Sequence, residues 1–73
     1  PMPVAEKIDV MRALGTLRPE ERMALSLFYL EDMPIAKIAS VMERTEGSVK
    51  TLLFRGKQHV SEYFKQDRYE RDE

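Results

Sequence analysis

The sequence predicts an all-α fold, a four-helix domain that contains a helix-turn-helix. Apolar residues recur at spacings of three and four rather than two, which is the period of helices and not of strands. The chain holds only 3 Gly and 4 Pro, and it has no Asn-Gly or Asp-Gly pair that would signal a β-hairpin. We therefore expect a run of short helices without a sheet.

Length and composition limit what can hold this fold together. The chain has 73 residues, 42% of them apolar, and no cysteine, so packed apolar side chains must supply the stability without disulfides or thiolate metal sites. We expect residues 1–66 to form one domain and residues 67–73 a charged, frayed tail. No apolar stretch approaches the roughly 20 residues that cross a bilayer, so we expect no membrane span. From the start at Pro1 we expect a fragment of a longer protein, with a processed product as the alternative.

The first two helices are predicted at about 5–15 and about 19–31. In the first, Ile8, Met11 and Leu14 are spaced to form one apolar stripe, and the following Gly15 is a typical helix stop. The second starts with a proline and two glutamates, which favour a first helical turn. Its residues from Met23 to Leu30 are apolar nearly all the way round. We therefore expect neighbours to cover this helix on several sides and Leu27 to lie in the core.

The third helix is short and the fourth is long. Pro34 follows a break at residues 31–33 and opens the third helix, which ends at residues 43–44 and has an apolar stripe of Ile35, Ile38, Ala39 and Met42. Thr45 is a good N-cap for the fourth helix, with Glu46 in its first turn. This helix is predicted over about 46–66, a length of about 30 Å.

The fourth helix has two sides of different character. The side predicted to be buried carries Val49, Leu53, Gly56, Val60 and Phe64. Leu52 falls on the border of this stripe, where its side chain can extend the core. The opposite side carries Gly47, Thr51, Phe54, Arg55 and Gln58, with Ser48 and Lys50 at its edges.

Charge is distributed unevenly along the chain, although the net charge is only -1. Residues 44–60 carry four basic side chains and one acidic, whereas residues 1–43 carry five basic and seven acidic, and residues 61–73 three basic and five acidic. A basic segment between acidic flanks is typical of a chain with one surface that faces an anion, and a solvated helix face gives the same pattern.

The residue inventory argues against an enzyme. There is one histidine, His59, which we expect to be an exposed helix residue, and no cysteine or glycine-rich phosphate loop. Glu20 and Glu21 are interpreted as a helix start rather than an acid/base pair. Too few histidines and cysteines are present for a metal site, and no cofactor is implied.

The arrangement of helix 35–42, a connection of about three residues and a longer basic helix is a helix-turn-helix. In such a unit the second helix enters the major groove, so Lys50, Arg55 and Lys57 would supply positive charge to a DNA surface. Phe54 lies away from the buried stripe and would meet an apolar base edge such as a thymine methyl group. The alternative is that Phe54 packs against the tail or a neighbouring protein.

Three segments together resemble region 4 of bacterial RNA polymerase sigma factors of the extracytoplasmic function (ECF) type in the sigma-70 family. These are Leu17-Arg18-Pro19-Glu20-Glu21-Arg22, then Leu27-Phe28-Tyr29-Leu30-Glu31-Asp32-Met33 with Ile38-Ala39, and Glu46-Gly47-Ser48-Val49-Lys50-Thr51-Leu52-Leu53-Phe54-Arg55-Gly56-Lys57. The resemblance covers about residues 5–65 and includes the spacing across three helices.

The resemblance implies a cytoplasmic, non-enzymatic transcription initiation module. It would bind the −35 element of double-stranded promoter DNA and dock on the β-subunit flap of RNA polymerase, with an anti-sigma factor as a further partner. The implied DNA-binding residues are Lys37, Thr45, Ser48, Lys50, Thr51, Phe54, Arg55, Lys57 and Gln58. Leu52 stands where the family usually has Arg, which removes one expected phosphate contact.

Two other classes of function remain open from the sequence. One is a sigma-like protein-interaction module that binds an anti-sigma factor or another partner with weak or no DNA binding, favoured by Leu52 and the acidic pI of about 5.9. The other is the carboxyl-terminal domain of a receiver-linked or quorum-type regulator, which fits the residues after Gly47 less well.

Overall fold

The computed structural model describes the backbone of residues 4–72 and the side chains of residues 8–65. In order these residues form α1 (Val4–Gly15), α2 (Pro19–Leu25), the π-helical turn η1 (Ser26–Leu30), α3 (Ile35–Met42) and α4 (Glu46–Asp72). The described backbone contains no strand. The all-α, four-helix prediction is confirmed.

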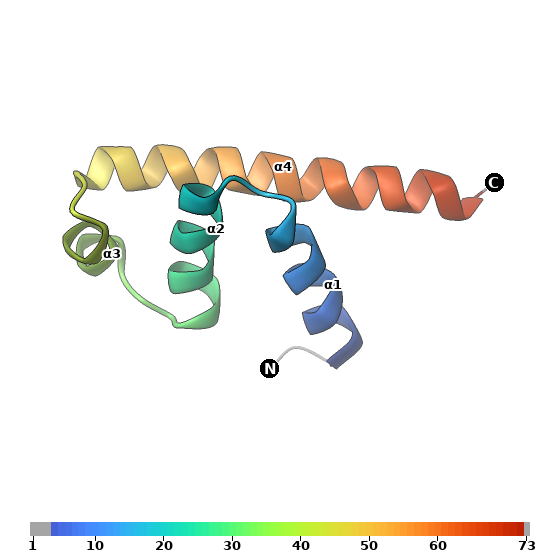
Figure 1. The fold of residues 1–73 in the computed structure, drawn as a ribbon, viewed down its shortest axis with the longest axis horizontal. Helices are drawn as coiled ribbons and strands as arrows, with labels where there is room; N and C mark the ends of the chain where they lie inside the picture. Colours follow the sequence, from blue (N-terminus) through green and yellow to red (C-terminus); the bar gives the residue numbers. More distant parts are fainter. Residues whose placement is uncertain (1–3, 73) are drawn as a thin grey trace.

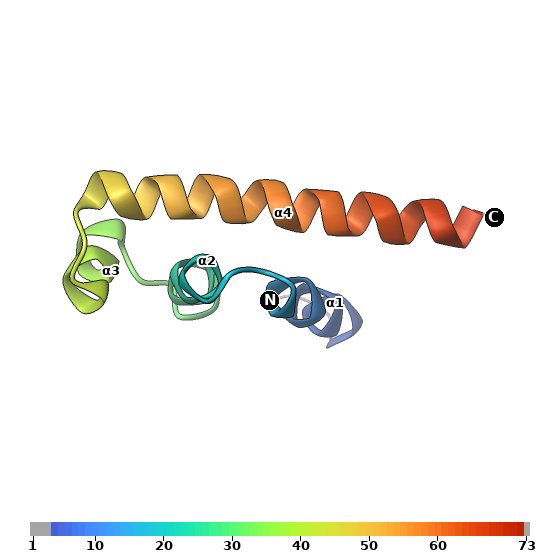
Figure 2. The same ribbon diagram turned by 45° about the horizontal axis from the view of Figure 1, so that its top comes forward.

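Helix α4 is a long rod, and the three other α-helices lie along one side of it (Figures 1 and 2). Helix α3 lies beside the start of α4, α2 comes next, and α1 lies farther along it. The carboxyl-terminal part of α4 extends past α1, which gives the fold its long dimension of 44 Å against 23 and 14 Å.

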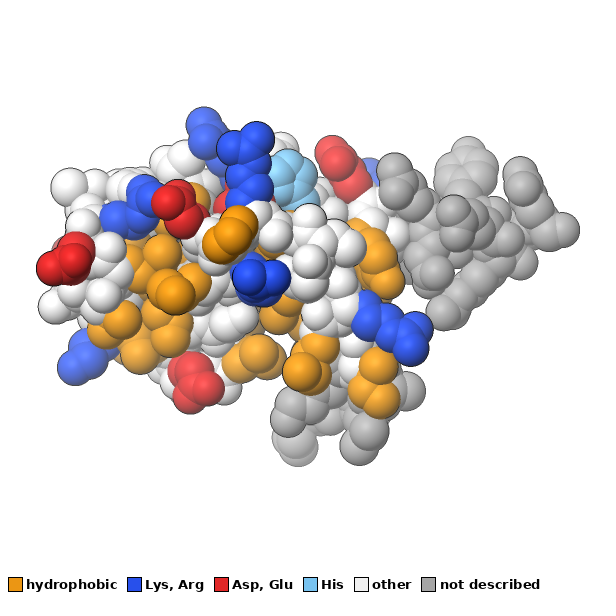
Figure 3. Space-filling model, viewed as in Figure 1, with side chains coloured by type: hydrophobic (Ala, Val, Ile, Leu, Met, Phe, Trp, Pro, Cys, Tyr) orange, Lys and Arg blue, Asp and Glu red, His pale blue; other side chains and the backbone are white. Residues whose placement is uncertain are grey.

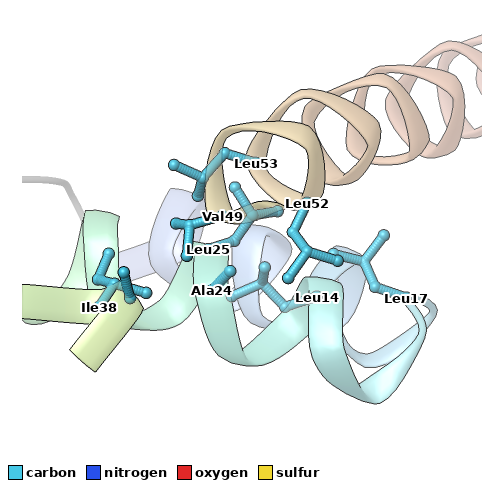
Figure 4. Close-up of a cluster of buried hydrophobic side chains, with 9 residues drawn as sticks. Leu14, Leu17, Ala24, Leu25, Ile38, Val49, Leu52 and Leu53 are labelled. Carbon is cyan, nitrogen blue, oxygen red and sulfur yellow. The ribbon is translucent and has the colours of Figure 1, made fainter. Parts of the chain in front are cut away.

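The core forms where α4 meets the other three helices (Figure 4). Ile38 of α3 and Val49 of α4 are the largest side chains that are fully buried. Around them pack buried apolar residues from all four helices and the first linker, namely Leu14, Leu17, Ala24, Leu25, Ala39, Leu52 and Leu53. The core is small, so each of these side chains holds a large share of the fold's apolar burial.

Helices α2 and α4 pack closely at Gly56. A Cβ atom added to Gly56 would lie 2.6 Å from Cδ1 of Leu25, closer than two such carbon atoms can sit. The absence of a side chain at Gly56 therefore lets Leu25 fill the space between the helices. Gly56 belongs to the buried stripe of α4, as predicted.

The predicted stripe of α1 is only partly correct. Leu14 is buried, but Ile8 and Met11 are 48% and 58% exposed. The face of α1 that meets the core instead carries Val10 and Ala13 together with Leu14. Ile8 lies two positions before Val10 and therefore points to nearly the opposite side of the helix.

The second helix differs from the prediction at its end and in its burial. The α-helix stops at Leu25 and continues as the wider turn η1, in which the N–H of Glu31 donates to the carbonyl of Ser26, five residues back, at 3.2 Å. The chain then turns through Asp32, whose φ of 53° is left-handed.

This helix is not covered on all sides. Met23, Tyr29 and Leu30 are exposed, and Leu27 and Phe28 are half-buried against the core. The prediction that Leu27 lies in the core is therefore correct only in part: Leu27 packs against the buried cluster but is not itself buried, because α1, α3 and α4 approach α2 and η1 without enclosing them.

Helix α4 was predicted to end near Gln66. In the structure it continues to Asp72. Residues 67–72 contain no glycine or proline that would stop a helix. The division into a domain of residues 1–66 and a tail of residues 67–73 stays a prediction.

Candidate nucleic-acid interface

The turn between α3 and α4 is tied down by backbone hydrogen bonds. Glu43 ends α3 in the left-handed conformation, with φ 56° and ψ 47°. The N–H of Arg44 donates to the carbonyl of Ala39 at 2.9 Å, and that of Glu43 to Ser40 at 3.3 Å, which together form a Schellman motif. This motif reverses the chain within three residues and fixes the angle at which α4 leaves the turn.

Thr45 caps the start of α4, as predicted. Its Oγ1 accepts a hydrogen bond from the backbone N–H of Ser48 at 3.1 Å, and its carbonyl accepts from the N–H of Val49 at 3.1 Å. Glu46 follows in the first turn, where negative charge suits the helix dipole. The helix that would enter a groove therefore begins at a defined residue.

The buried and exposed sides of α4 separate cleanly along its first three turns. Val49, Leu52 and Leu53 are buried, whereas every residue predicted to face DNA between Lys50 and Gln58 is exposed. These exposed residues are Lys50, Thr51, Phe54, Arg55, Lys57 and Gln58. In Figure 3, Lys and Arg side chains project along α4 near the histidine, while apolar side chains gather over α3 and the neighbouring end of α2.

Among the side chains of residues 8–65, Phe54 is the most exposed of the large apolar ones, at 63%. It lies on the polar side of α4, one turn from Lys50, Thr51 and Gln58. The hydroxyl of Thr51 donates to the carbonyl of Gly47 at 3.1 Å, so its methyl group and oxygen are held in one orientation on this side. An apolar ring flanked by hydrogen-bonding and basic side chains suits the edge of a base pair.

Leu52 is buried, with 8% of its surface exposed. Its side chain points toward Leu14 and Leu17 in Figure 4. Leu52 therefore extends the core, which confirms the expectation from its place at the border of the stripe.

Lys57 lies at the opposite edge of the exposed side from Arg55. Its Nζ is 5.4 Å from the centre of the Tyr29 ring, within range of a cation–π interaction. It also lines an apolar groove of about 260 Å³ between α1, η1 and α4, whose walls include Val10, Leu30 and Val60. The structure thus brings Lys57 toward this groove, away from Thr51 and Arg55.

Two predicted residues lie outside the main body of this surface. Lys37 is exposed on α3. Ser48 is half-buried, and its Oγ accepts a hydrogen bond from Nη1 of Arg44 at 2.8 Å. Arg44, which the sequence reasoning did not select, also pairs through Nη2 with Oε2 of Glu20 at the start of α2.

A second polar contact joins α2 and α4. The Nδ1 of His59 lies 2.8 Å from Oε1 of Glu21, and the side chain of Glu21 is 5% exposed. His59 is about half exposed, so the expectation of an exposed helix residue holds, but its partner was missed. Glu21 was interpreted only as part of a helix start. Its position three residues before Ala24 and four before Leu25, on the buried side of α2, was the available signal.

Comparison with known proteins assigns the fold. Residues 7–60 match the family described as Sigma-70, region 4. The chain belongs to this family. Region 4 of the sigma-70 family is a DNA-binding, non-catalytic module of transcription initiation factors, so the resemblance drawn from the sequence is confirmed.

A solved structure supports the same assignment. In a complex of RsbN and BldN, one chain superposes on this region 4 domain with a TM-score of 0.76 and 26% sequence identity. The match covers 80% of this chain and 42% of that chain, so the chain spans less than half the length of its structural relative. A comparison with curated proteins finds no match.

Neither a membrane-spanning helix nor a metal centre is found in the described residues. Within the described part of the chain, no helix is both long and apolar enough to cross a bilayer. Among the side chains of residues 8–65, no three His, Cys, Asp or Glu residues come together as metal ligands would.

Proposed function

We propose that this region 4 domain reads the −35 element of a promoter through the exposed side of α4. The observation that carries the proposal is the separation of α4 into a buried apolar side and an exposed side with Lys50, Phe54 and Arg55. The basic residues would neutralise phosphates, and the first turns of α4 would contact base edges in the major groove. The predicted set also includes Lys37, Thr45, Ser48, Thr51, Lys57 and Gln58.

The partner on the other side of the domain is proposed to be the β-subunit flap of RNA polymerase. The groove between α1, η1 and α4 is apolar, and two of the residues that line it, Tyr29 and Leu30, are exposed. Exposed apolar surface of this kind is typical of a protein interface. The domain would work in the cytoplasm, where RNA polymerase acts.

An anti-sigma factor is the second proposed protein partner. The related fold was solved as part of a complex of two proteins, RsbN and BldN, which supports capture of this type of domain by another chain. A version of the domain that binds such a partner with weak or no DNA binding is the alternative function.

Binding measurements with selected DNA test the main proposal. Duplexes are selected from a random pool, and the Kd is measured by fluorescence anisotropy for the selected duplex and a scrambled one over about 50 to 200 mM salt. We expect tighter binding to the selected duplex and a steep fall of affinity with salt. Arg55→Ala should cost about 1 to 3 kcal/mol on the selected duplex and much less on the scrambled one.

The outcomes separate the two functions. Failure to select any duplex, or binding that does not weaken with salt, would favour the protein-interaction module. Equal losses for Arg55→Ala on both duplexes would mean that Arg55 contacts only phosphate.

The proposed flap docking has its own test. Leu30→Asp places a charge at the edge of the groove and should abolish capture of a purified flap fragment without changing the DNA Kd. Val41→Asp is the matched control, because Val41 is an apolar residue on α3 that is 52% exposed, against 43% for Leu30, and does not line the groove. Equal loss of flap capture in both variants would contradict docking at the groove.

A further inference from the structure

Arg44 connects the start of α2 to the start of α4. Its side chain is 30% exposed, and its two terminal nitrogens reach different elements, Nη1 to Ser48 and Nη2 to Glu20, which is 24 residues away in sequence. A guanidinium group is a planar fork that can hold two partners at fixed angles, which a lysine ammonium group does not do.

The backbone on both sides of Arg44 is also held. Its own N–H closes the Schellman motif on Ala39, and the next residue, Thr45, caps the N–H of Ser48. Ser48 is therefore fixed at two points, its backbone N–H by Thr45 and its side-chain oxygen by Arg44.

The contact with Arg44 sets what the hydroxyl of Ser48 can do. A serine hydroxyl has one hydrogen to donate and two lone pairs that accept. Because the hydrogen bond from Arg44 uses one lone pair of the oxygen, the hydroxyl hydrogen turns away from Arg44 and stays available to donate to a bound partner. The exposed carboxylate of Glu20 meanwhile offsets the charge of Arg44 and draws the guanidinium toward α2.

We propose that Arg44 is a positioning residue for DNA binding, which orients Ser48 as a hydrogen-bond donor to an acceptor oxygen of DNA. The partner of Ser48 is a phosphate oxygen, since Ser48 lies in the capped first turn of α4, where backbone N–H groups favour an anion. Arg44 acts through Ser48 and does not itself neutralise a phosphate. This inference rests on the proposed DNA binding of the domain.

A double-mutant cycle tests this role. The Kd for the selected duplex and its salt dependence are measured for the unchanged chain, Ser48→Ala, Arg44→Ala and the double variant. Each single substitution should weaken binding about tenfold, the effect of one hydrogen bond to a charged group, and the double variant should be no weaker than the singles. The log-log salt slope should stay the same in all variants, because a neutral hydroxyl releases no counterion.

Two further variants separate the geometry of the guanidinium group from its charge and from a general loss of arginine. Arg44→Lys retains the charge but not the fork, so it should lose as much affinity as Arg44→Ala; this variant also serves if Arg44→Ala does not fold. Arg12→Ala is the matched control, because Arg12 is an exposed arginine on α1, and it should change neither Kd nor slope. Melting curves establish that each variant is folded.

Several results would overturn the role of Arg44. A salt slope that falls by about 0.9 in Arg44→Ala would show that Arg44 contacts a phosphate directly. Losses that multiply in the double variant would show that the two residues act independently, and full affinity in Arg44→Lys would show that charge alone matters. Absence of DNA binding by the unchanged chain would instead overturn the proposed function itself.

Discussion

The two sides of α4 differ in burial, and the difference separates residues that stabilise the fold from residues that folding does not require to be apolar. On one side Val49, Leu52 and Leu53 are buried against α1, α2 and α3. On the same side Gly56 has no side chain, which leaves room for Leu25. On the other side Phe54 stays 63% exposed, although it is the largest apolar residue of these turns. Packing of the fold accounts for the apolar residues on the first side, but it does not account for an exposed phenylalanine on the second.

The two sides of α4 should respond differently to substitution. A change on the buried side alters the free energy of unfolding, and DNA affinity falls only because the domain is lost. A change on the exposed side leaves unfolding nearly unaltered and alters affinity directly. The predictions below test this division, from the largest expected effect to the smallest.

Leu25→Ala should have the largest effect. Leu25 is buried where α2 meets α4, and its truncation should lower the free energy of unfolding by about 2 to 5 kcal/mol, enough to unfold a domain of this size. Urea denaturation followed by circular dichroism measures the loss. Leu27→Ala is the control, because Leu27 is half-buried and should cost less.

Gly56→Ala sharpens this prediction. In the Leu25→Ala background the added methyl group no longer meets Leu25, so it should recover part of the lost stability through the better helix propensity of alanine. If Leu25→Ala melts like the unchanged chain, the close contact of α2 and α4 is not the centre of the core.

Leu52→Arg should destabilise the domain and leave the salt slope of DNA binding unchanged. The substitution removes a buried leucine, a loss of about 1.5 to 3 kcal/mol, and forces a charge to the edge of the core. Thermal melting gives the stability, and anisotropy at several salt concentrations gives the slope. A stable variant whose slope becomes steeper by about one unit would place residue 52 on the DNA side.

Phe54→Ala should separate affinity from stability. The melting curve should change by no more than about 0.5 kcal/mol, because the ring is exposed, while binding to the selected duplex weakens. If the ring contacts a thymine methyl group, replacing thymine by deoxyuridine in the duplex should weaken the unchanged chain but not the variant. If Phe54→Ala binds DNA with unchanged affinity, Phe54 does not contact DNA, and a contact with a protein partner is favoured instead.

Glu43→Gly should have a small effect, and a stabilising one. Glu43 holds a left-handed backbone conformation that costs a residue with a Cβ atom about 1 kcal/mol and costs glycine little. The free energy of unfolding should therefore rise by up to about 1 kcal/mol in a urea titration. Destabilisation instead would mean that the side chain of Glu43 makes a contact that outweighs the backbone strain.

The positions of the helices were predicted from the sequence more accurately than which side of each helix is buried. Spacing and capping residues located all four helices, and Thr45 caps α4 as expected. Periodicity alone could not tell that Ile8 and Met11 stay exposed, since that depends on which side of α1 the other helices meet. The turn η1 was also missed, because nothing in a run of apolar residues distinguishes a π-helical turn from an α-helical one.

In the candidate site, the position of a residue along α4 was enough to predict that it is exposed. It was not enough to predict contacts with residues that are distant in the sequence. Helical spacing placed Lys50, Phe54 and Gln58 on one exposed side. The contact of Arg44 with Glu20 joins residues 24 apart, and that of His59 with Glu21 joins residues 38 apart. Such pairs arise from how α2 packs against the turn and α4, which local pattern does not determine.

In the proposed function, DNA meets the exposed side of α4 and not the apolar groove. The most direct test is a titration of the ¹⁵N-labelled chain with the selected duplex, followed by amide chemical shifts in two-dimensional NMR spectra. We predict the largest shifts from Thr45 to Gln58, with smaller ones at Val10, Tyr29 and Leu30 around the groove. Shifts that concentrate at the groove residues, with residues 45–58 unchanged, would contradict the account.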